Sequence, residues 1–509
     1  MCIRDSRYAK RTGKTRVTAM PLGLDTPSTI GIALLVLGPA FREAKKRLIE
    51  GGTEVEAATQ LAATEAWHIG ICALLIMGLV KLMMAFGSNW VRTAFPRAGL
   101  LGSLAAIALV LIAFMPMVEL TSNSIVGFAS LLVVFVTLIG RSKLPFKIPG
   151  ALGAVLVGCA LWYLIVGIEN ATGFKITGEG PPPTDPVWFP QEWVDAFRFE
   201  WFAAMGQAFN YLPYIVPFAI ATVIGGIDCA ESAASVGDDY QTGNVIGIEA
   251  IATILAAVCG GVVQTTPYIG HPAYKAMGGR AAYTLATALF IGAAGLIGYF
   301  GLIFNYVPKA ALLPILVFIG LEITAQSFHV TPKRHYAALA VACIPAFAKL
   351  VTIFLGQYVP VMDYDVAIAA GKIKEGDMFF LKGQMTNLTI LAGGFILSSL
   401  IWASALAKII DRRFFAASVY FAVGGILVLF GVMHSPLFGD KMFLPWELSD
   451  TTIFQPEEKM LVVQLALAYL VMAVLLFALG HFIKEKVINT DEEFEKISTV
   501  ELEIENDEH

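Results

Sequence analysis

Residues 262–279 read VVQTTPYIGHPAYKAMGG, an apolar segment that Pro267, Gly270 and Pro272 interrupt. Residues 18–38, TAMPLGLDTPSTIGIALLVLG, form a second such segment, whose prolines also gather at one end. Non-helical backbone survives at membrane depth only where protein or a water-filled cavity satisfies its N–H and C=O groups. Either segment alone is also compatible with a kinked helix beside a loop, since proline and glycine are common in membrane helices. Together they predict two broken elements that border one site.

The composition is that of a membrane protein. Hydrophobic residues make up 57% of the 509 residues and charged residues only 15%, whereas soluble domains have about 25% charged residues. The mean hydropathy is +0.71, and several apolar runs approach or exceed the roughly 18 residues that indicate a membrane crossing. The sequence therefore predicts an all-α protein that crosses the membrane many times. The six cysteines show no CxxC spacing, so we expect neither a disulfide framework nor a zinc site, and no cofactor is expected.

Hydropathy predicts fourteen membrane segments. They lie near residues 22–41, 67–87, 98–117, 123–140, 149–168, 208–230, 245–263, 268–278, 282–305, 309–328, 336–358, 386–407, 414–433 and 460–482. If every segment crosses, the connections rich in lysine and arginine fall on one side, apart from the mixed stretch FREAKKRLIE. The positive-inside rule then places both termini in the cytoplasm. We expect a multi-pass protein of a cell membrane, in a bacterium the inner membrane.

The same pattern predicts six parts of the chain. They are a cytoplasmic start at 1–19, a first repeat at 20–169, an extracytoplasmic loop at 170–206, a second repeat at 207–410, additional spans at 411–484 and an acidic cytoplasmic tail at 485–509. The Trp- and Phe-rich second half of the loop predicts an interfacial helix. Residues 1–6, MCIRDS, resemble a translated sequencing-adapter leader. Two spans precede the broken segment of the second repeat and none precedes the first, so we expect a fragment that lacks two amino-terminal spans.

The broken segments supply the candidate solute-binding residues. These are Asp25, Thr26 and Ser28 in the first segment and Gln264, Thr265, Thr266, Tyr268, Gly270 and His271 in the second. A half-helix that starts at such a break exposes backbone N–H groups to a ligand. Asp25 and Ser28 are also typical capping residues, and capping is compatible with ligand binding. Paired Gly/Pro-interrupted segments in two halves of a chain indicate the binding site of a transporter.

Three carboxylates are candidates for proton coupling, and one of them, Asp228, is also a candidate solute-binding residue. Asp228 and Glu231 lie in GGIDCAESAASVGDD, residues 225–239, and residues three apart share a helix face. A charge at bilayer depth is by default a functional hypothesis, and two close carboxylates raise one pKa, which suits a proton carrier. The alternative for Asp228 is a partly solvated helix end. Glu249 is the third candidate, although a negative charge near a helix start is also stabilising by itself.

The other charged residues of this region receive structural assignments. Asp238 and Asp239 are assigned to a cytoplasmic loop. Glu322 lies inside a span, and we expect it to form a structural ion pair with Lys349 or Lys81, because buried charges are paired.

At these residues the chain resembles the nucleobase–ascorbate permease superfamily, with the hypoxanthine/guanine/adenine permease branch nearest. IDCAESA resembles the FDTxGTL-like motif of the family's eighth helix, and IEAIAT resembles the ADALGT-like motif of its ninth. TTPYIGHPAYKAMGGR resembles its tenth helix, TTYIESAAGIAAGGR-like, and VPKAALLPILVFIGLEI its twelfth. The resemblance spans about residues 17–410 and is most specific over 217–330. It implies the seven-plus-seven inverted-repeat fold of the uracil–proton symporter, and the family's acidic residues fall on Asp228 and Glu249.

One departure from the family concerns the solute. The tenth-helix glutamate that binds a nucleobase in the family falls on Gly270 here, with His271 and Gln264 nearby as possible substitutes. The resemblance implies a nucleobase of the xanthine, uracil or purine type as solute, a proton or a sodium ion as coupling ion, and a homodimer.

The sequence leaves three functions open. The first is proton-coupled symport of a nucleobase by alternating access. The second is transport of sulfate or a carboxylate by the same fold, since half-helix N-termini suit anions. The third is an intramembrane enzyme that uses Asp228 and His271, against which no HExxH or GxSxG motif is present. No Walker motif occurs, so the chain itself is not expected to hydrolyse ATP, and no nucleic-acid partner is expected.

Overall fold

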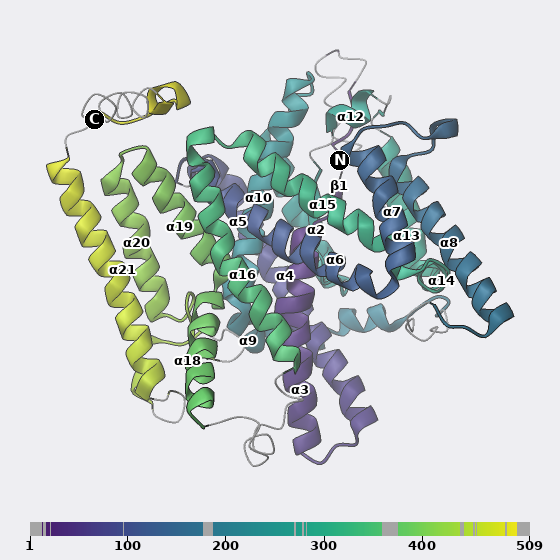
Figure 1. The fold of residues 1–509 in the computed structure, drawn as a ribbon, viewed down its shortest axis with the longest axis horizontal. Coiled ribbons are helices and arrows are strands. Elements are labelled where there is room, and N and C mark those ends of the chain that lie inside the picture. Colours follow the sequence, from purple (N-terminus) through teal and green to yellow (C-terminus); the bar gives the residue numbers. More distant parts are fainter. Residues whose placement is uncertain are drawn as a thin grey trace.

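The computed structural model describes residues 13, 17–20, 22–94, 96–176, 187–268, 271–276, 279–280, 282–358, 375–437, 442–450, 454, 456–483 and 486–495. Within these residues the chain is helical apart from one two-stranded sheet and short connections. Seven of the described helices are long and apolar enough to cross a membrane, or eight if the bent pair α18–α19 is a single span. The chain is therefore an all-α polytopic membrane protein, as the composition predicts (Figure 1).

The first half of the chain begins with a strand and continues as long helices. Strand β1 (Leu22–Leu24) leads into α2 (Thr26–Ile32) and α3 (Gly38–Glu50), which π-helical residues 33–37 join into one helix. A second π-helical stretch at 108–114 joins α5 to α6. The remaining bounds are α4 (Val55–Ala94), α5 (Arg97–Ile107), α6 (Met115–Leu120), α7 (Ser124–Val134) and α8 (Gly150–Thr172).

The second half opens with short helical turns. The stretch predicted as an interfacial helix forms 3₁₀ turns at 192–198 and 200–204, followed by α9 (Met205–Ala208). The elements that follow are α10 (Leu212–Ser235), α11 (Thr242–Val258), β2 (Thr265–Pro267), α12 (His271–Ala276), α13 (Tyr283–Ile297), α14 (Phe300–Tyr306), α15 (Lys309–Val330), α16 (Tyr336–Tyr358), α18 (Glu375–Ala392), α19 (Phe395–Ile410), α20 (Phe414–Leu429) and α21 (Pro456–Phe482).

Two predicted segments are wrong as single straight spans. The segment 282–305 is divided at Gly298, whose φ of +92° ends α13 in the left-handed region. The segment 386–407 is divided at Gly394, and α18 and α19 meet there at 72°. Gly394 has a φ of +62°, and a Cβ at this position would lie 2.1 Å from the carbonyl oxygen of Val432. Glycine therefore permits both breaks, which an average of hydropathy over the segment does not register.

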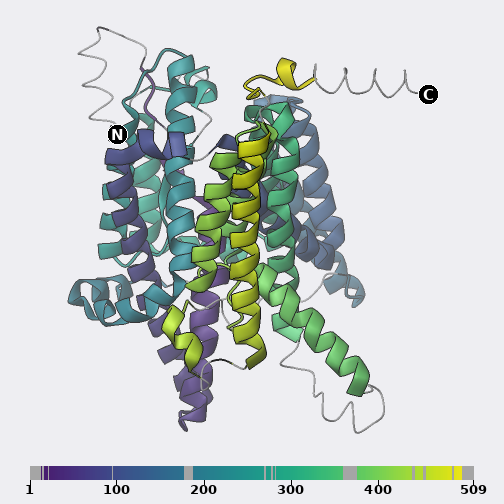
Figure 2. The same cartoon turned by 90° about the vertical axis from the view of Figure 1, so that its left-hand side faces the viewer.

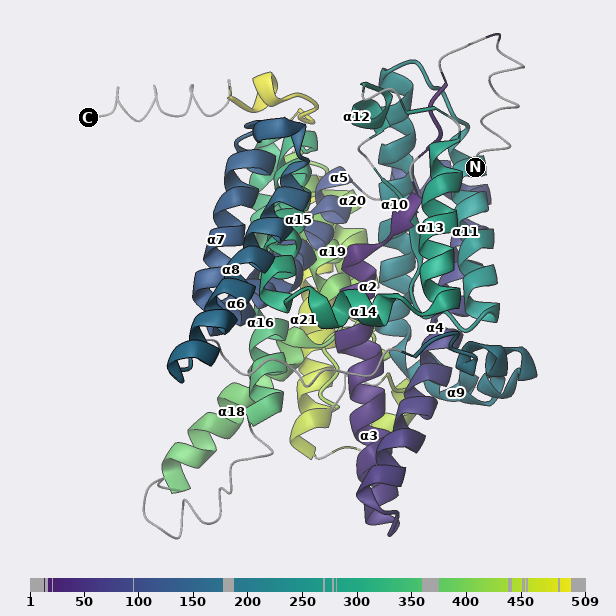
Figure 3. The same ribbon diagram turned by 90° about the vertical axis from the view of Figure 1, so that its right-hand side faces the viewer.

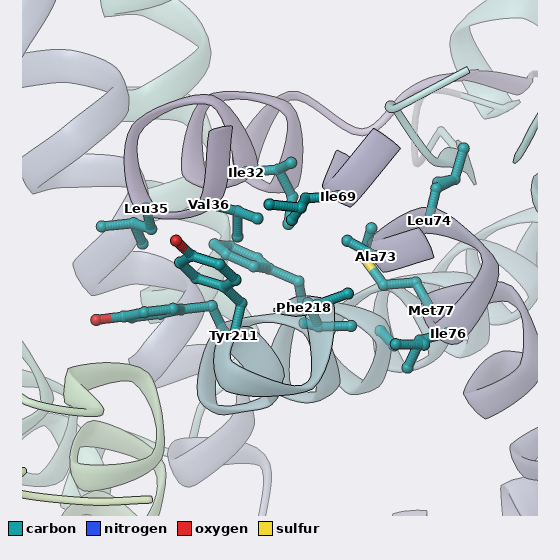
Figure 4. Packing of buried hydrophobic residues seen from close by; sticks show 14 of the residues in the cluster. Ile32, Leu35, Val36, Ile69, Ala73, Leu74, Ile76, Met77, Tyr211 and Phe218 are labelled. Atoms are coloured by element: carbon teal, nitrogen blue, oxygen red, sulfur yellow. The ribbon is translucent and has the colours of Figure 1, made fainter. Parts of the chain in front are cut away.

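The helices form two groups with α2 between them. Figure 3 shows α7, α8 and α15 on one side and α10, α11 and α13 on the other, with α14 running across the direction of the long helices. The largest apolar core lies where α2 and its π-helical continuation meet α4 and α10 (Figure 4). Ile32, Val36, Met77 and Phe218 are at most 2% exposed in this core. The first broken segment is thus held from both sides by buried apolar contacts.

The two helices after residue 411 form a smaller unit of their own. α20 and α21 lie against each other and continue from α19 (Figure 2). A separate apolar cluster joins them. The hydroxyl of Tyr469 accepts a hydrogen bond from the indole N–H of Trp402 at 2.6 Å and lies 2.8 Å from Nε2 of His434. This chain of polar contacts ties α21 to α19 and to the loop after α20.

Candidate functional site

The two broken segments meet in the sheet. Strands β1 and β2 pair in antiparallel orientation, with Gly23 opposite Thr266 and Leu24 opposite Thr265. The N–H of Asp25 extends this pairing by donating to the carbonyl of Gln264 at 3.0 Å. Each strand supplies backbone hydrogen-bond partners to the other, and internal pairing of this kind is the condition for non-helical backbone in a membrane. The two broken segments therefore lie against each other, as a shared site requires.

Asp25 caps the helix that follows β1. Its Oδ2 accepts the backbone N–H of Ser28 at 2.9 Å, and its backbone carbonyl accepts the hydroxyl of Thr29 at 2.6 Å. Asp25 is 7% exposed and Ser28 is 1% exposed. The capping interpretation is therefore correct for Asp25, and the capped carboxylate still borders the cavity described below.

Gln264 connects both broken segments to α10. Its Nε2 lies 3.4 Å from Oδ2 of Asp25 and 3.4 Å from the carbonyl of Phe218. Its Oε1 accepts the hydroxyl of Thr222 at 3.4 Å. Gln264 is fully buried, so these contacts satisfy an amide that would otherwise be costly to bury. Gln264 thus holds the site together instead of pointing freely at a ligand.

A buried ion pair contacts the backbone of β2 at Thr265. Nζ of Lys81 in α4 lies 2.5 Å from Oε1 of Glu249 in α11, and both side chains are fully buried. The same Nζ donates to the carbonyl of Thr265 at 2.8 Å. The expectation that Lys81 pairs with Glu322 is therefore wrong. Nζ of Lys349, the other expected partner of Glu322, donates to the hydroxyl of Tyr214 at 3.1 Å.

A cavity of about 480 Å³ lies beside the strands, within the range of small-molecule sites. Seven elements line it: the β1–α2 junction, α5, the π-helical stretch at 135–139, α8, α10, β2 with Tyr268, and α15. Its polar lining side chains are Asp25, Thr222, Thr266, Tyr268, Glu322, Gln326 and Ser327. Among the described residues that line it there is no lysine, arginine or histidine. The cavity therefore presents carboxylates, amide and hydroxyl groups in an otherwise apolar enclosure.

Glu322 is the cavity residue that the sequence assigns to a different role. It lies on α15, and its Oε1 accepts the side-chain N–H of Gln326, one turn further on, at 3.1 Å. The sequence predicts a structural ion pair, and the structure instead places this carboxylate in the cavity lining. The sequence shows that Glu322 is a carboxylate within a predicted membrane span, but it does not show which neighbouring helix this carboxylate faces.

His271 lies in a separate buried cluster. Its Nε2 is 2.9 Å from Oδ2 of Asp238, and Oδ1 of the same carboxylate is 2.9 Å from Nζ of Lys275. The backbone N–H of Thr18, before β1, donates to Asp238 at 3.2 Å. Asp238 and Asp239 both lie in the connection between α10 and α11, as predicted, but the side chain of Asp238 is fully buried, whereas that of Asp239 is exposed. Nothing in the sequence distinguishes these adjacent aspartates.

Several candidates lie wholly or partly outside the described residues. Gly270 is one of them, and so are the side chains of Asp228, Glu231 and Thr26, although the backbone of Asp228 and Glu231 belongs to α10. Cys229, which follows Asp228, lines the cavity. Thr266 and Tyr268 line it too, whereas the hydroxyl of Thr265 is buried with no hydrogen-bond partner among the described residues.

The geometry defines a class of protein: a polytopic α-helical membrane protein with a largely apolar cavity, carrying a few polar side chains, beside two broken segments that pair with each other. No protein-family model matches the chain, and no curated protein matches it. Within the described residues, no group of three or more His, Cys, Asp or Glu side chains is placed to hold a metal ion.

Proposed function

We propose that the protein is a secondary-active transporter that binds a small polar solute in the cavity between β1, β2, α10 and α15. The observation that carries this proposal is the antiparallel pairing of two broken membrane segments at the edge of a cavity lined by Asp25 and Glu322. Crossed, discontinuous elements near the middle of the membrane are typical of transporter sites. Burying a carboxylate within a membrane span is costly, so a carboxylate in such a place is by default a functional hypothesis.

The lining favours a neutral solute with N–H donors over an anion. Two carboxylates accept hydrogen bonds, and no described lining residue carries a positive side chain that would attract sulfate or a carboxylate. The rings of Phe218 and Phe318 supply apolar surface for a flat molecule. The resemblance of TTPYIGHPAYKAMGGR to a nucleobase permease helix points the same way. A nucleobase is therefore the proposed solute.

Alternating access is the proposed mechanism. In this proposal the group of α10, α11 and α13 carries the strands and moves against the group of α7, α8 and α15, which exposes the cavity to each side in turn (Figure 3). The resemblance adds an inverted seven-plus-seven repeat, a homodimer and termini in the cytoplasm. Asp228 is the proposed proton carrier by the same resemblance, and the pairing of Glu249 with Lys81 gives Glu249 a supporting role at β2.

Uptake in a host that lacks nucleobase transport tests the proposal. We expect the chain to confer uptake of labelled xanthine or uracil, with loss of uptake in Asp228→Asn and in the presence of an uncoupler. Excess unlabelled uracil and purines should compete, and sulfate should not. If only sulfate competed with the labelled solute, the anion transporter would be favoured. If the uncoupler left uptake unchanged, proton symport would be excluded.

A further inference from the structure

Glu322 and Gln326 form a polar pair on α15, and both side chains line the cavity. We infer that this pair binds the solute directly and selects for a molecule with an N–H beside a C=O, such as the lactam edge of a nucleobase. The inference rests on the proposed transport function, and it assigns to α15 the specificity that the sequence places in the broken segments alone.

The pair is held in one place by the helix. Residues four apart on a helix lie on one face, and Glu322 Oε1 accepts the Gln326 amide N–H at 3.1 Å. The hydroxyl of Thr324, between them in sequence, donates to Gly320 within the helix and to Ala105 in the neighbouring α5. The helix therefore packs by one face on α5 while Glu322 and Gln326 line the cavity.

Hydrogen-bonding capacity remains on both side chains. One carboxylate oxygen of Glu322 receives the amide N–H, and the second oxygen has no partner among the described residues. The amide of Gln326 retains one N–H donor and its carbonyl acceptor. The free groups are thus an acceptor on a carboxylate next to a donor on an amide. A ligand edge that offers N–H beside C=O satisfies both.

The second carboxylate of the cavity lining, Asp25, already forms hydrogen bonds within the protein. Asp25 Oδ2 is engaged by the N–H of Ser28 and by Gln264. The two lysines expected to neutralise Glu322 are directed elsewhere, Lys81 to Glu249 and Lys349 to Tyr214. Among the described residues, Glu322 has one oxygen without a hydrogen bond and no lysine in the cavity lining. A donor-bearing ligand would stabilise such a carboxylate in a largely apolar enclosure.

Binding measurements on the purified full chain test the inference. The probes are radiolabelled uracil and xanthine, with 1-methyluracil and 3-methyluracil as competitors. The variants are Glu322→Gln, Glu322→Leu and Gln326→Leu. The matched control is Glu119→Gln, whose carboxylate pairs with Lys309 at an exposed position outside the cavity lining.

We expect Glu322→Gln and Glu322→Leu to weaken binding about tenfold or more, as for loss of a hydrogen bond to a charged group. At least one N-methyl isomer should compete about tenfold more weakly than uracil in the wild type and in Glu119→Gln. That methylation penalty should disappear in Glu322→Leu, which has no acceptor for the N–H, and should shrink in Glu322→Gln, whose neutral amide oxygen accepts a weaker hydrogen bond than a carboxylate. A merely structural role of Glu322 would leave the penalty in place.

The possible results distinguish the role of Glu322 and Gln326 in solute binding from the proposed transport function. Wild-type binding of uracil or xanthine, with unchanged affinity in the Glu322 variants, would overturn the inference and leave the proposed function standing. Weaker binding with the methylation penalty intact would also overturn it. Wild-type protein that binds neither probe would overturn the nucleobase assignment and this inference with it. Glu322→Gln preserves size and shape, so a folding failure of Glu322→Leu does not remove the test.

Discussion

Lys81 and Glu249 form a buried ion pair that contacts the backbone of β2. Both charges are fully buried, and the ammonium also holds the backbone of β2. Burying two ions carries a large desolvation cost that only good geometry offsets, and removal of one partner leaves the other charge uncompensated. The sequence marks both residues as unusual because they are charged in apolar segments. It does not reveal that they face each other, because hydropathy contains no information on which helices pack together.

Removing one partner of this pair should destabilise the protein strongly. We expect Lys81→Met to lower the free energy of unfolding by about 3–5 kcal/mol, measured by thermal or denaturant unfolding in detergent. The double variant Lys81→Met with Glu249→Leu should recover part of that loss. The control is Lys46→Met, whose partner Glu50 is exposed and whose loss should cost at most about 1 kcal/mol. Equal effects of both lysine variants would contradict the description.

The two broken segments, which pair through β1 and β2, were predicted from the sequence only in part. The sequence predicts that both border one site, because proline, glycine and polar residues interrupt two apolar runs. It does not predict the register, since three-residue strands have too few side chains to specify one. It also misses the bends at Gly298 and Gly394, which depend on positive φ angles within apolar sequence.

Cross-linking tests the register of β1 against β2. Residues directly opposite in an antiparallel pair have Cα atoms about 4.5–5.5 Å apart, within the range that a disulfide bridges. We therefore expect Gly23→Cys with Thr266→Cys to form a disulfide on mild oxidation in membranes. Leu22→Cys with Thr265→Cys, two positions out of register, should remain reduced. Preferential cross-linking of the second pair would show that the strands pair differently.

Substitution of Gly394 tests the bend between α18 and α19. Alanine at Gly394 would need a positive φ and would place its Cβ against the Val432 carbonyl, so we expect a loss of about 2 kcal/mol or more. Gly292→Ala, in α13 with open space around its Cβ, should be neutral or stabilising because alanine favours helices. Thermal unfolding of both variants provides the comparison, and an unaffected Gly394→Ala would argue against the sharp bend.

The whole molecule is joined by contacts between distant parts of the chain. Arg334, between α15 and α16, bonds Asp411 at 2.9 Å after α19 and Asp491 at 2.7 Å in the C-terminal segment. Burial raises the pKa of Asp411, but hydrogen bonds from His335 and Arg334 outweigh burial and leave that pKa below its ordinary value of 3.8. The C-terminal segment thus docks on the helical bundle, whereas the sequence predicts only a solvated acidic tail.

Arg334→Met should release this docking. We expect a loss of about 3 kcal/mol at neutral pH and faster proteolysis within 486–495. Because the folded-state pKa of Asp411 is lowered, the stabilisation is complete above its ordinary value of 3.8 and disappears as pH falls through the lowered value. The difference in unfolding temperature between wild type and variant should therefore narrow in acid below that value. A difference that is constant with pH would contradict the ion-pair assignment.

A cavity that carries carboxylates in a largely apolar lining, between two groups of helices, is the basis for proposing transport. Uptake of labelled xanthine and uracil into proteoliposomes that contain only this chain tests it most directly. With an inward proton gradient imposed, we expect accumulation above the external concentration, which an uncoupler abolishes and Glu322→Gln weakens. Proteoliposomes that accumulate neither compound under any imposed gradient, while the reconstituted protein remains folded, would contradict the account.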